Sequence, residues 1–190
     1  FMLLIFLLTM PHRMNDSMMV LQLKELGGSD AMAGWAWALA AGSEIPVFLL
    51  LGRYLNRFHE MALLAIIALI GSLRWLLSAF VTDPLPFMLL QTMNCITFAA
   101  FWVVSVQYVI RVVPRELQST GLSVLSMVFL GIAGIAGGIV GGWIRDNFGG
   151  FAMYGTGAAV AAAAAILIVM THIADRKNVP SSGNALKPGQ

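Results

Sequence analysis

Four ionisable side chains stand inside long apolar segments of this sequence: Arg13, Asp16, Glu44 and Arg74. An ionisable group at the middle of a bilayer costs at least about 2.5 kcal/mol, and such groups therefore pair with one another or line a pathway. The set contains two acids and two bases. It predicts either proton transfer coupled to the movement of a solute, or ion pairs that only hold helices together.

The depths of these residues suggest how they pair. At a rise of about 1.5 Å per residue, Asp16 and Arg74 lie nearer the outer face, whereas Arg13 and Glu44 lie deeper. We therefore expect the pairs Asp16–Arg74 and Arg13–Glu44. An acid whose arginine partner can move away is a workable proton switch. Glu44 is the better candidate because Pro46 frees a backbone carbonyl and permits a bend.

Polar side chains near these charges are candidates for solute binding. His12 precedes Asp16 by four residues and shares its helical face, which favours a cavity-lining role over simple packing. One face of the expected helix at residues 85–110 carries amides and aromatic rings at spacings of three and four: Gln91, Asn94, Thr97, Phe98, Phe101, Trp102 and Ser105. Amides can bind hydroxyls and rings can stack on sugars, bases or aryl groups, although interhelical hydrogen bonding explains the pattern equally well. The substrate-binding candidates are His12, Gln91, Asn94, Phe98 and Trp102.

Enzymatic chemistry finds no support in the sequence. There is no nucleophile–base pair and no metal-ligand spacing, Cys95 is the single cysteine, and the three histidines are scattered. We therefore expect no catalytic residue, no metal and no cofactor. The basic residues lie in short loops between apolar segments, which gives no indication of a nucleic-acid partner.

Composition identifies the elements that must position these residues. Hydrophobic residues make up 59% and charged residues 11% of the chain, whereas a soluble domain has about 25% charged residues. Lipid is the solvent that tolerates such a surface, and about 20 apolar residues span its core. We expect an all-α integral membrane protein with six spans, near residues 1–26, 31–51, 61–81, 85–110, 117–144 and 151–173.

Lysine and arginine predict the orientation. One set of loops and the tail holds seven of them: Arg53, Arg57, Arg111, Arg115, Arg176, Lys177 and Lys187. The opposite loops hold only Lys24 and Arg145. We therefore expect both ends of this segment to be cytoplasmic in a cell membrane, with residues 174–190 forming a disordered tail.

One expected helix carries glycine at every fourth position, Gly134, Gly138 and Gly142, with Gly131, Gly137 and Gly141 beside them. Rows of small residues let helix backbones approach closely in membranes. These glycines predict a packing or sliding surface.

Several loops resemble those of the major facilitator superfamily. Residues 51–58 (LGRYLNRF) are similar to its G-x-L-x-D-R-x-G motif, with Asn56 in place of Asp, and residues 113–121 and 141–149 resemble its later helix boundaries. Residues 23–27, 41–46, 73–77 and 91–98 are similar to the branch holding phenylpropionate permease, nucleoside–proton symporters and lactose permease.

The resemblance implies the C-terminal half of a twelve-helix fold, made of two inverted three-helix repeats. The N-terminal half would be its partner, because the sequence starts inside an apolar run and looks cut. By resemblance to lactose permease, Glu44 and Arg74 would match its coupling acid and arginine. Asn94 stands where relatives tend to have His, and residues 85–110 hold no acid, so Glu44 or Asp16 must carry any coupling.

The expected function is therefore secondary transport of a small polar or aromatic metabolite (a sugar, nucleoside or aryl acid) by proton symport. An exporter or drug–proton antiporter is the alternative, since cavity charges are few and aromatic residues many. A non-transporting six-helix assembly or enzyme is a third class that no motif favours.

Overall fold

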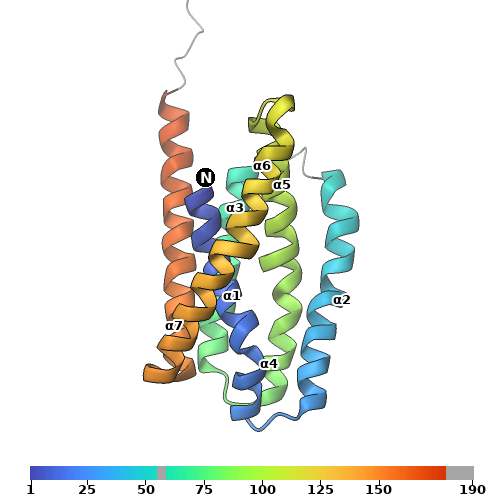
Figure 1. The fold of residues 1–190 in the computed structure, drawn as a ribbon, viewed down its shortest axis with the longest axis vertical. Coiled ribbons are helices and arrows are strands. Elements are labelled where there is room, and N and C mark those ends of the chain that lie inside the picture. Colours follow the sequence, from blue (N-terminus) through green and yellow to red (C-terminus); the bar gives the residue numbers. More distant parts are fainter. Residues whose placement is uncertain (55–58, 179–190) are drawn as a thin grey trace, which may run out of the picture.

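The computed structural model describes residues 1–54 and 59–178, and every regular element in these ranges is helical. The first three helices are α1 (Met2–Glu25), α2 (Asp30–Tyr54) and α3 (Glu60–Phe80). Gly27, with a φ of 86°, makes the turn between α1 and α2, in a backbone region that glycine enters without strain. The helices stand side by side as a bundle (Figure 1).

A fourth rod runs from Pro84 to Val112 and changes its winding along the way. It consists of α4 (Pro84–Leu90), the 3₁₀ turn η2 (Gln91–Met93), the π-helical η3 (Cys95–Ala100) and α5 (Phe101–Val112). The sequence predicted a uniform helix here. π-Helical turns are rare and frequently occur at functional sites, and this one adjoins Asn94 and contains Phe98.

The last rod bends back on itself. It contains η4 (Arg115–Leu117), α6 (Gln118–Ser126), the π-helical η5 (Met127–Ile132) and α7 (Ala133–Asn178). Gly149 has a φ of 82° and a ψ of 174°, a conformation open essentially to glycine alone. The chain reverses there, so the two parts of α7 run in opposite directions (Figure 1).

The end of α7 corrects the expected boundary of the tail. The helix continues past Ile173 to Asn178, whereas a disordered segment was expected from residue 174. Between Ile173 and Pro180 the sequence contains no helix-breaking residue. Helices usually end just before a proline. The expected loop residues 55–58 and the tail residues 179–190 lie outside the described residues.

Four helices of the described chain are long and apolar enough to cross a membrane: Asp30–Leu51, Glu60–Phe80, Pro84–Val112 and Arg115–Thr171. The last of these includes the bend at Gly149. α1 is not among them, and the middle of this helix carries His12, Arg13 and Asp16. The number of crossings and their boundaries stay a prediction.

α1 and α3 both pack chiefly against α7, and the buried side chains form two apolar clusters. The first half of α1 contributes Ile5 to one cluster, and the second half contributes Met14 to the other. His12 lies between them along the helix. A polar layer therefore stands where the two clusters meet.

Glycines bring α7 against α1, but in a different row from the one that the sequence suggested. A Cβ on Gly137 would stand 2.7 Å from Arg13 Cβ, and one on Gly141 would stand 2.9 Å from Met14 Cγ. A Cβ on Gly134 would meet nothing within 4 Å. Within the described residues, the closest backbone approach is thus at Gly137 and Gly141, while Gly138 and Gly142 contact Ser17 and Met18 at the edge.

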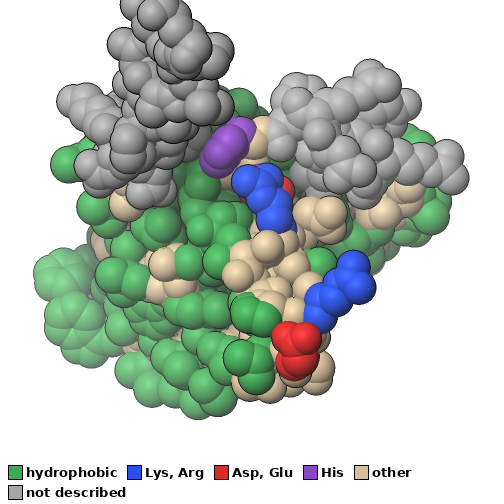
Figure 2. Space-filling view, turned by 90° about the horizontal axis from the view of Figure 1, so that it is seen from above, with side chains coloured by type: hydrophobic (Ala, Val, Ile, Leu, Met, Phe, Trp, Pro, Cys, Tyr) green, Lys and Arg blue, Asp and Glu red, His purple; other side chains and the backbone are tan. Residues whose placement is uncertain are grey.

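Ion pairs mark the two ends of the bundle. At one end Glu60, which begins α3, accepts two hydrogen bonds from Arg111 at 2.8 and 2.6 Å. That end also holds the start of α1 and the end of α7 (Figure 1). Viewed from this end, the molecule shows few charged side chains among many apolar ones (Figure 2). At the other end Arg145 is bound by Gln22 and Glu25.

Candidate functional site

A cleft of about 180 Å³ opens between α1, α2 and the middle of the fourth rod. Its lining combines charged groups, an amide and aromatic rings: His12, Arg13, Asp16, Trp37, Glu44, Asn94 and Phe98. All seven are polar, charged or aromatic groups of the kind that small polar solutes require. The cleft therefore gathers most of the functional candidates in one place.

The charges that α1 contributes to the cleft pair with each other. Arg13 Nη1 donates to Asp16 Oδ2 at 3.0 Å, one helical turn away. Asp16 Oδ1 also lies 3.7 Å from His12 Nε2. The Arg13 guanidinium stands 4.5 Å from the centroid of the Phe129 ring, within cation–π range.

On the opposite wall, Glu44 is bound through Asn94 to a buried arginine. Asn94 Nδ2 donates to Glu44 Oε1 at 2.6 Å, and Asn94 Oδ1 accepts from Arg74 Nη1 at 2.9 Å. Arg74 is completely buried. One amide thus uses its donor on the acid and its acceptor on the base.

Arg74 is held by further neutral partners behind the cleft. Its Nη2 donates to Gln91 Oε1 at 2.8 Å and its Nη1 donates to Thr97. Gln91 Oε1 also accepts from Asn15, which in turn accepts from Tyr154. The guanidinium lies 4.4 Å from the Trp75 ring. A buried cation needs such a set of acceptors because it has left water.

The expected ion pairs do not form. Asp16 pairs with Arg13 rather than with Arg74, and Glu44 is bound by Asn94 rather than by Arg13. Depth along a helix carries no information on the direction in which each helix turns its side chain. Arg13 and Asp16 share one face of α1 and so satisfy each other.

The substrate-binding candidates separate into two groups. His12, Asn94 and Phe98 line the cleft, where the rings of His12 and Phe98 stack with centroids 5.2 Å apart. Gln91 is buried beside Arg74, and Trp102 packs on Phe129 with centroids 4.8 Å apart. Neither Gln91 nor Trp102 lines the cleft.

Trp37 is a cleft residue that the sequence reasoning missed. It lies seven residues before Glu44, which is close to two helical turns, so both side chains occupy the same face of α2. That spacing could have revealed it. Trp37 is 44% exposed and lines the cleft, so part of its side chain is accessible to a solute.

Comparison with known proteins places the chain in a family. Residues 1–156 match the MFS_1 like family. The chain belongs to the major facilitator superfamily. It is 35% identical over 146 residues to maltose permease of Geobacillus stearothermophilus, an alignment that covers 75% of this chain and 36% of that protein. It is also 26% identical over 130 residues to sugar efflux transporter A of Escherichia coli (strain K12), covering 68% and 33% of the two chains.

This major facilitator chain spans about a third of the length of the curated relatives it matches. No solved structure matches it. Membership confirms the predicted superfamily and the all-helical, multi-pass membrane fold. Among the described residues there is no cluster of three His, Cys, Asp or Glu side chains that could hold a metal ion.

Proposed function

We propose that this chain is the C-terminal six-helix half of a secondary transporter that moves a sugar across the cytoplasmic membrane by proton symport. The observation that carries the proposal is the cleft, where two carboxylates, one amide and two large aromatic rings converge. A carboxylate accepts hydrogen bonds from hydroxyl groups, and an amide both donates to them and accepts from them. The apolar face of a sugar ring stacks on an aromatic ring, and Trp37 and Phe98 offer such faces.

A sugar fits this proposal better than the nucleosides and aryl acids that the sequence left open. An aryl acid is an anion and would require an unpaired cation, whereas Arg13 already pairs with Asp16 at 3.0 Å. Both similar proteins carry a sugar in their names, maltose permease and sugar efflux transporter A. Maltose is therefore the first solute to test.

The test is uptake of radiolabelled maltose into vesicles that contain the full-length protein. Replacing Trp37 by Ala removes this ring from the cleft and should raise the half-saturating maltose concentration at least about fivefold, since stacking on an aromatic ring contributes about 1–3 kcal/mol. Trp143→Ala is the matched control because Trp143 is exposed outside the cleft and packs on Phe148. Equal half-saturation in both variants would contradict a sugar site in this cleft.

For proton coupling we propose Glu44 as the residue that gains and loses the proton, with Asp16 as the second candidate. Arg74 and Arg13 would be the positively charged residues that interact with these acids. Glu44 is half-buried and is bound by a neutral amide at 2.6 Å, so it can gain a proton without first breaking an ion pair. Glu44→Gln should abolish uphill accumulation of maltose while leaving exchange of internal for external maltose intact. Glu116→Gln, at an exposed position, is the control. Uphill accumulation by Glu44→Gln would remove Glu44 from this role.

An exporter or antiporter is the competing function, and the similarity to a sugar efflux transporter favours it. The two mechanisms move protons in opposite directions relative to the solute. A pH-sensitive dye inside the vesicles separates them: entry of maltose should acidify the interior under symport. If the interior becomes more alkaline as maltose enters, the protein is an antiporter rather than a symporter.

The partner of this chain is proposed to be an N-terminal six-helix half, which would supply the missing wall of the cleft at the interface between two bundles. Both ends of the present segment are proposed to be cytoplasmic. Cells that produce residues 1–190 alone should not accumulate maltose, and co-production of the upstream half should restore accumulation. Full accumulation by residues 1–190 alone would instead favour a homodimer.

A further inference from the structure

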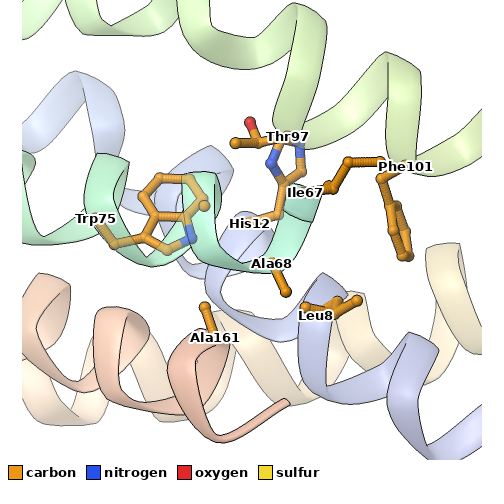
Figure 3. A pocket seen from close by; sticks show the side chains of 9 residues that line it. Leu8, His12, Ile67, Ala68, Trp75, Thr97, Phe101 and Ala161 are labelled. Atoms are coloured by element: carbon orange, nitrogen blue, oxygen red, sulfur yellow. The ribbon is translucent and has the colours of Figure 1, made fainter. Parts of the chain in front are cut away.

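A second, much smaller pocket lies behind the cleft, on the far side of His12. Its volume is about 10 Å³, and its polar lining residues are His12, Trp75 and Thr97, among apolar side chains of α1, α3 and α7. Figure 3 shows His12 next to Thr97, with Trp75 facing them across the pocket. A polar space of about 10–15 Å³ is the size that holds one water molecule.

His12 supplies the first polar atom at this pocket. Its Nε2 faces Asp16 at 3.7 Å, and its ring stacks on Phe98. Its Nδ1 is buried and has no hydrogen-bond partner among the described residues. Buried polar nitrogens are almost always hydrogen-bonded, to protein or to ordered water. In the tautomer that carries its proton on Nε2, the nitrogen facing Asp16, Nδ1 is an acceptor that needs a donor.

Thr97 supplies the second polar atom. Its hydroxyl donates to the Met93 carbonyl at 3.2 Å and accepts from Arg74 Nη1. A hydroxyl oxygen has two lone pairs, so Thr97 Oγ1 can accept one more hydrogen bond. Trp75 Nε1 also borders the space, because a Cβ on Gly71 would lie 3.9 Å from it and 3.8 Å from Thr97 Cγ2.

We propose that one ordered water molecule occupies this pocket, where it donates to His12 Nδ1 and to Thr97 Oγ1 and accepts from the Trp75 indole N–H. Three partners are the usual number for a buried water.

This water would join two sets of polar side chains, one held by charge contacts on α1 and one held by hydrogen bonds. The first is Arg13, Asp16 and His12 on α1, and the second runs from Thr97 through Arg74 and Asn94 to Glu44. The two acidic residues of the cleft would then belong to one continuous network. The inference does not depend on which solute is carried.

Gly71 offers a steric test that leaves every polar side chain in place. A methyl group there meets its nearest atoms at 3.8 and 3.9 Å, which is ordinary contact, but it takes up space that the water needs. Gly155→Ala is the matched control because a Cβ at that helical position meets nothing within 4 Å. In the purified full-length protein, Gly71→Ala should lower the unfolding midpoint by several degrees relative to Gly155→Ala. An equal or higher midpoint would overturn the water site.

The ¹⁵N resonance of His12 Nδ1 provides a measurement that general loss of packing does not imitate. In histidine-labelled protein, this nitrogen should have the chemical shift of a hydrogen-bonded acceptor, and Gly71→Ala should move it to the value of a nitrogen without a donor. Gly155→Ala should leave it unchanged. A wild-type resonance already at the value without a donor would overturn the proposal. Neither experiment measures transport, so failure here is distinct from failure of the proposed function.

Discussion

Asn94 joins Glu44 to Arg74: its amide nitrogen lies 2.6 Å from Glu44 Oε1, and its carbonyl oxygen lies 2.9 Å from Arg74 Nη1. A direct contact between acid and base would form an ion pair, whereas the interposed amide keeps them apart while satisfying both. Glu44 therefore stays at the cleft and Arg74 stays fully buried. Asn94 itself cannot titrate.

Replacing Asn94 by Ala should destabilise the protein by roughly 3 kcal/mol, because each lost hydrogen bond to a charged group contributes about 1.5–3 kcal/mol. Arg74 would lose an acceptor in a place that water does not reach. Thermal unfolding of the purified full-length protein measures the change. Asn147→Ala is the control, since Asn147 is exposed and bonds only the Trp143 carbonyl in the described structure. Similar losses in both variants would show that the bridge adds nothing to stability.

Replacing Asp16 by Asn tests whether this carboxylate serves the stability of the protein, solute binding, or both. The Arg13 and Asp16 side chains are only 19% and 23% exposed and line the cleft, so the loss of this charged hydrogen bond should cost about 1.5–3 kcal/mol of stability. Maltose affinity should fall by about tenfold or more, because a hydrogen bond to a charged group is lost. Equilibrium binding and thermal unfolding of the same preparation test both parts. Unfolding at a much lower temperature with unchanged affinity would assign Asp16 to structure alone.

Replacing Gly137 by Ala should destabilise the contact between α1 and α7. The new Cβ would stand 2.7 Å from Arg13 Cβ and 3.0 Å from the Met10 carbonyl oxygen, so the helices must separate, at a cost of about 1–3 kcal/mol. Gly155→Ala, which has open space around it, should be neutral or stabilising by about 0.5–1 kcal/mol. The comparison uses chemical or thermal unfolding. If both variants gain stability, the helices are not in close contact at Gly137.

The pair Glu60–Arg111 should respond asymmetrically to mutation. The Glu60 side chain is 6% exposed and that of Arg111 is 58% exposed. Arg111→Gln leaves a buried carboxylate without its cation and should cost about 1–3 kcal/mol. Glu60→Gln leaves an arginine that can turn to water, and it should cost less than about 1 kcal/mol. Equal costs would indicate that Glu60 is solvated despite its burial.

Much of the fold could be predicted from the composition and from the residues that interrupt the apolar segments. Apolar runs of about 20 residues predict membrane helices, and the helices α1, α2 and α3 begin and end within a few residues of the expected limits. The reversal at Gly149 lies in an expected loop. Two features have no signal in an apolar pattern: the π-helical turns of the fourth and last rods, and the row of glycines that approaches α1. Both depend on how neighbouring helices pack.

The sequence by itself predicted which residues would form a polar layer, because an ionisable or amide side chain inside an apolar segment is stable only where polar partners surround it. Arg13, Asp16, Glu44, Arg74 and Asn94 all belong to the polar layer that the structure describes. Only the tertiary structure decided their partners. Pairing depends on helix azimuth, on the π-helical turn beside Asn94 and on the close approach of α7 to α1. Sequence spacing fixes depth along a helix, whereas direction around it relative to a neighbour is set by packing.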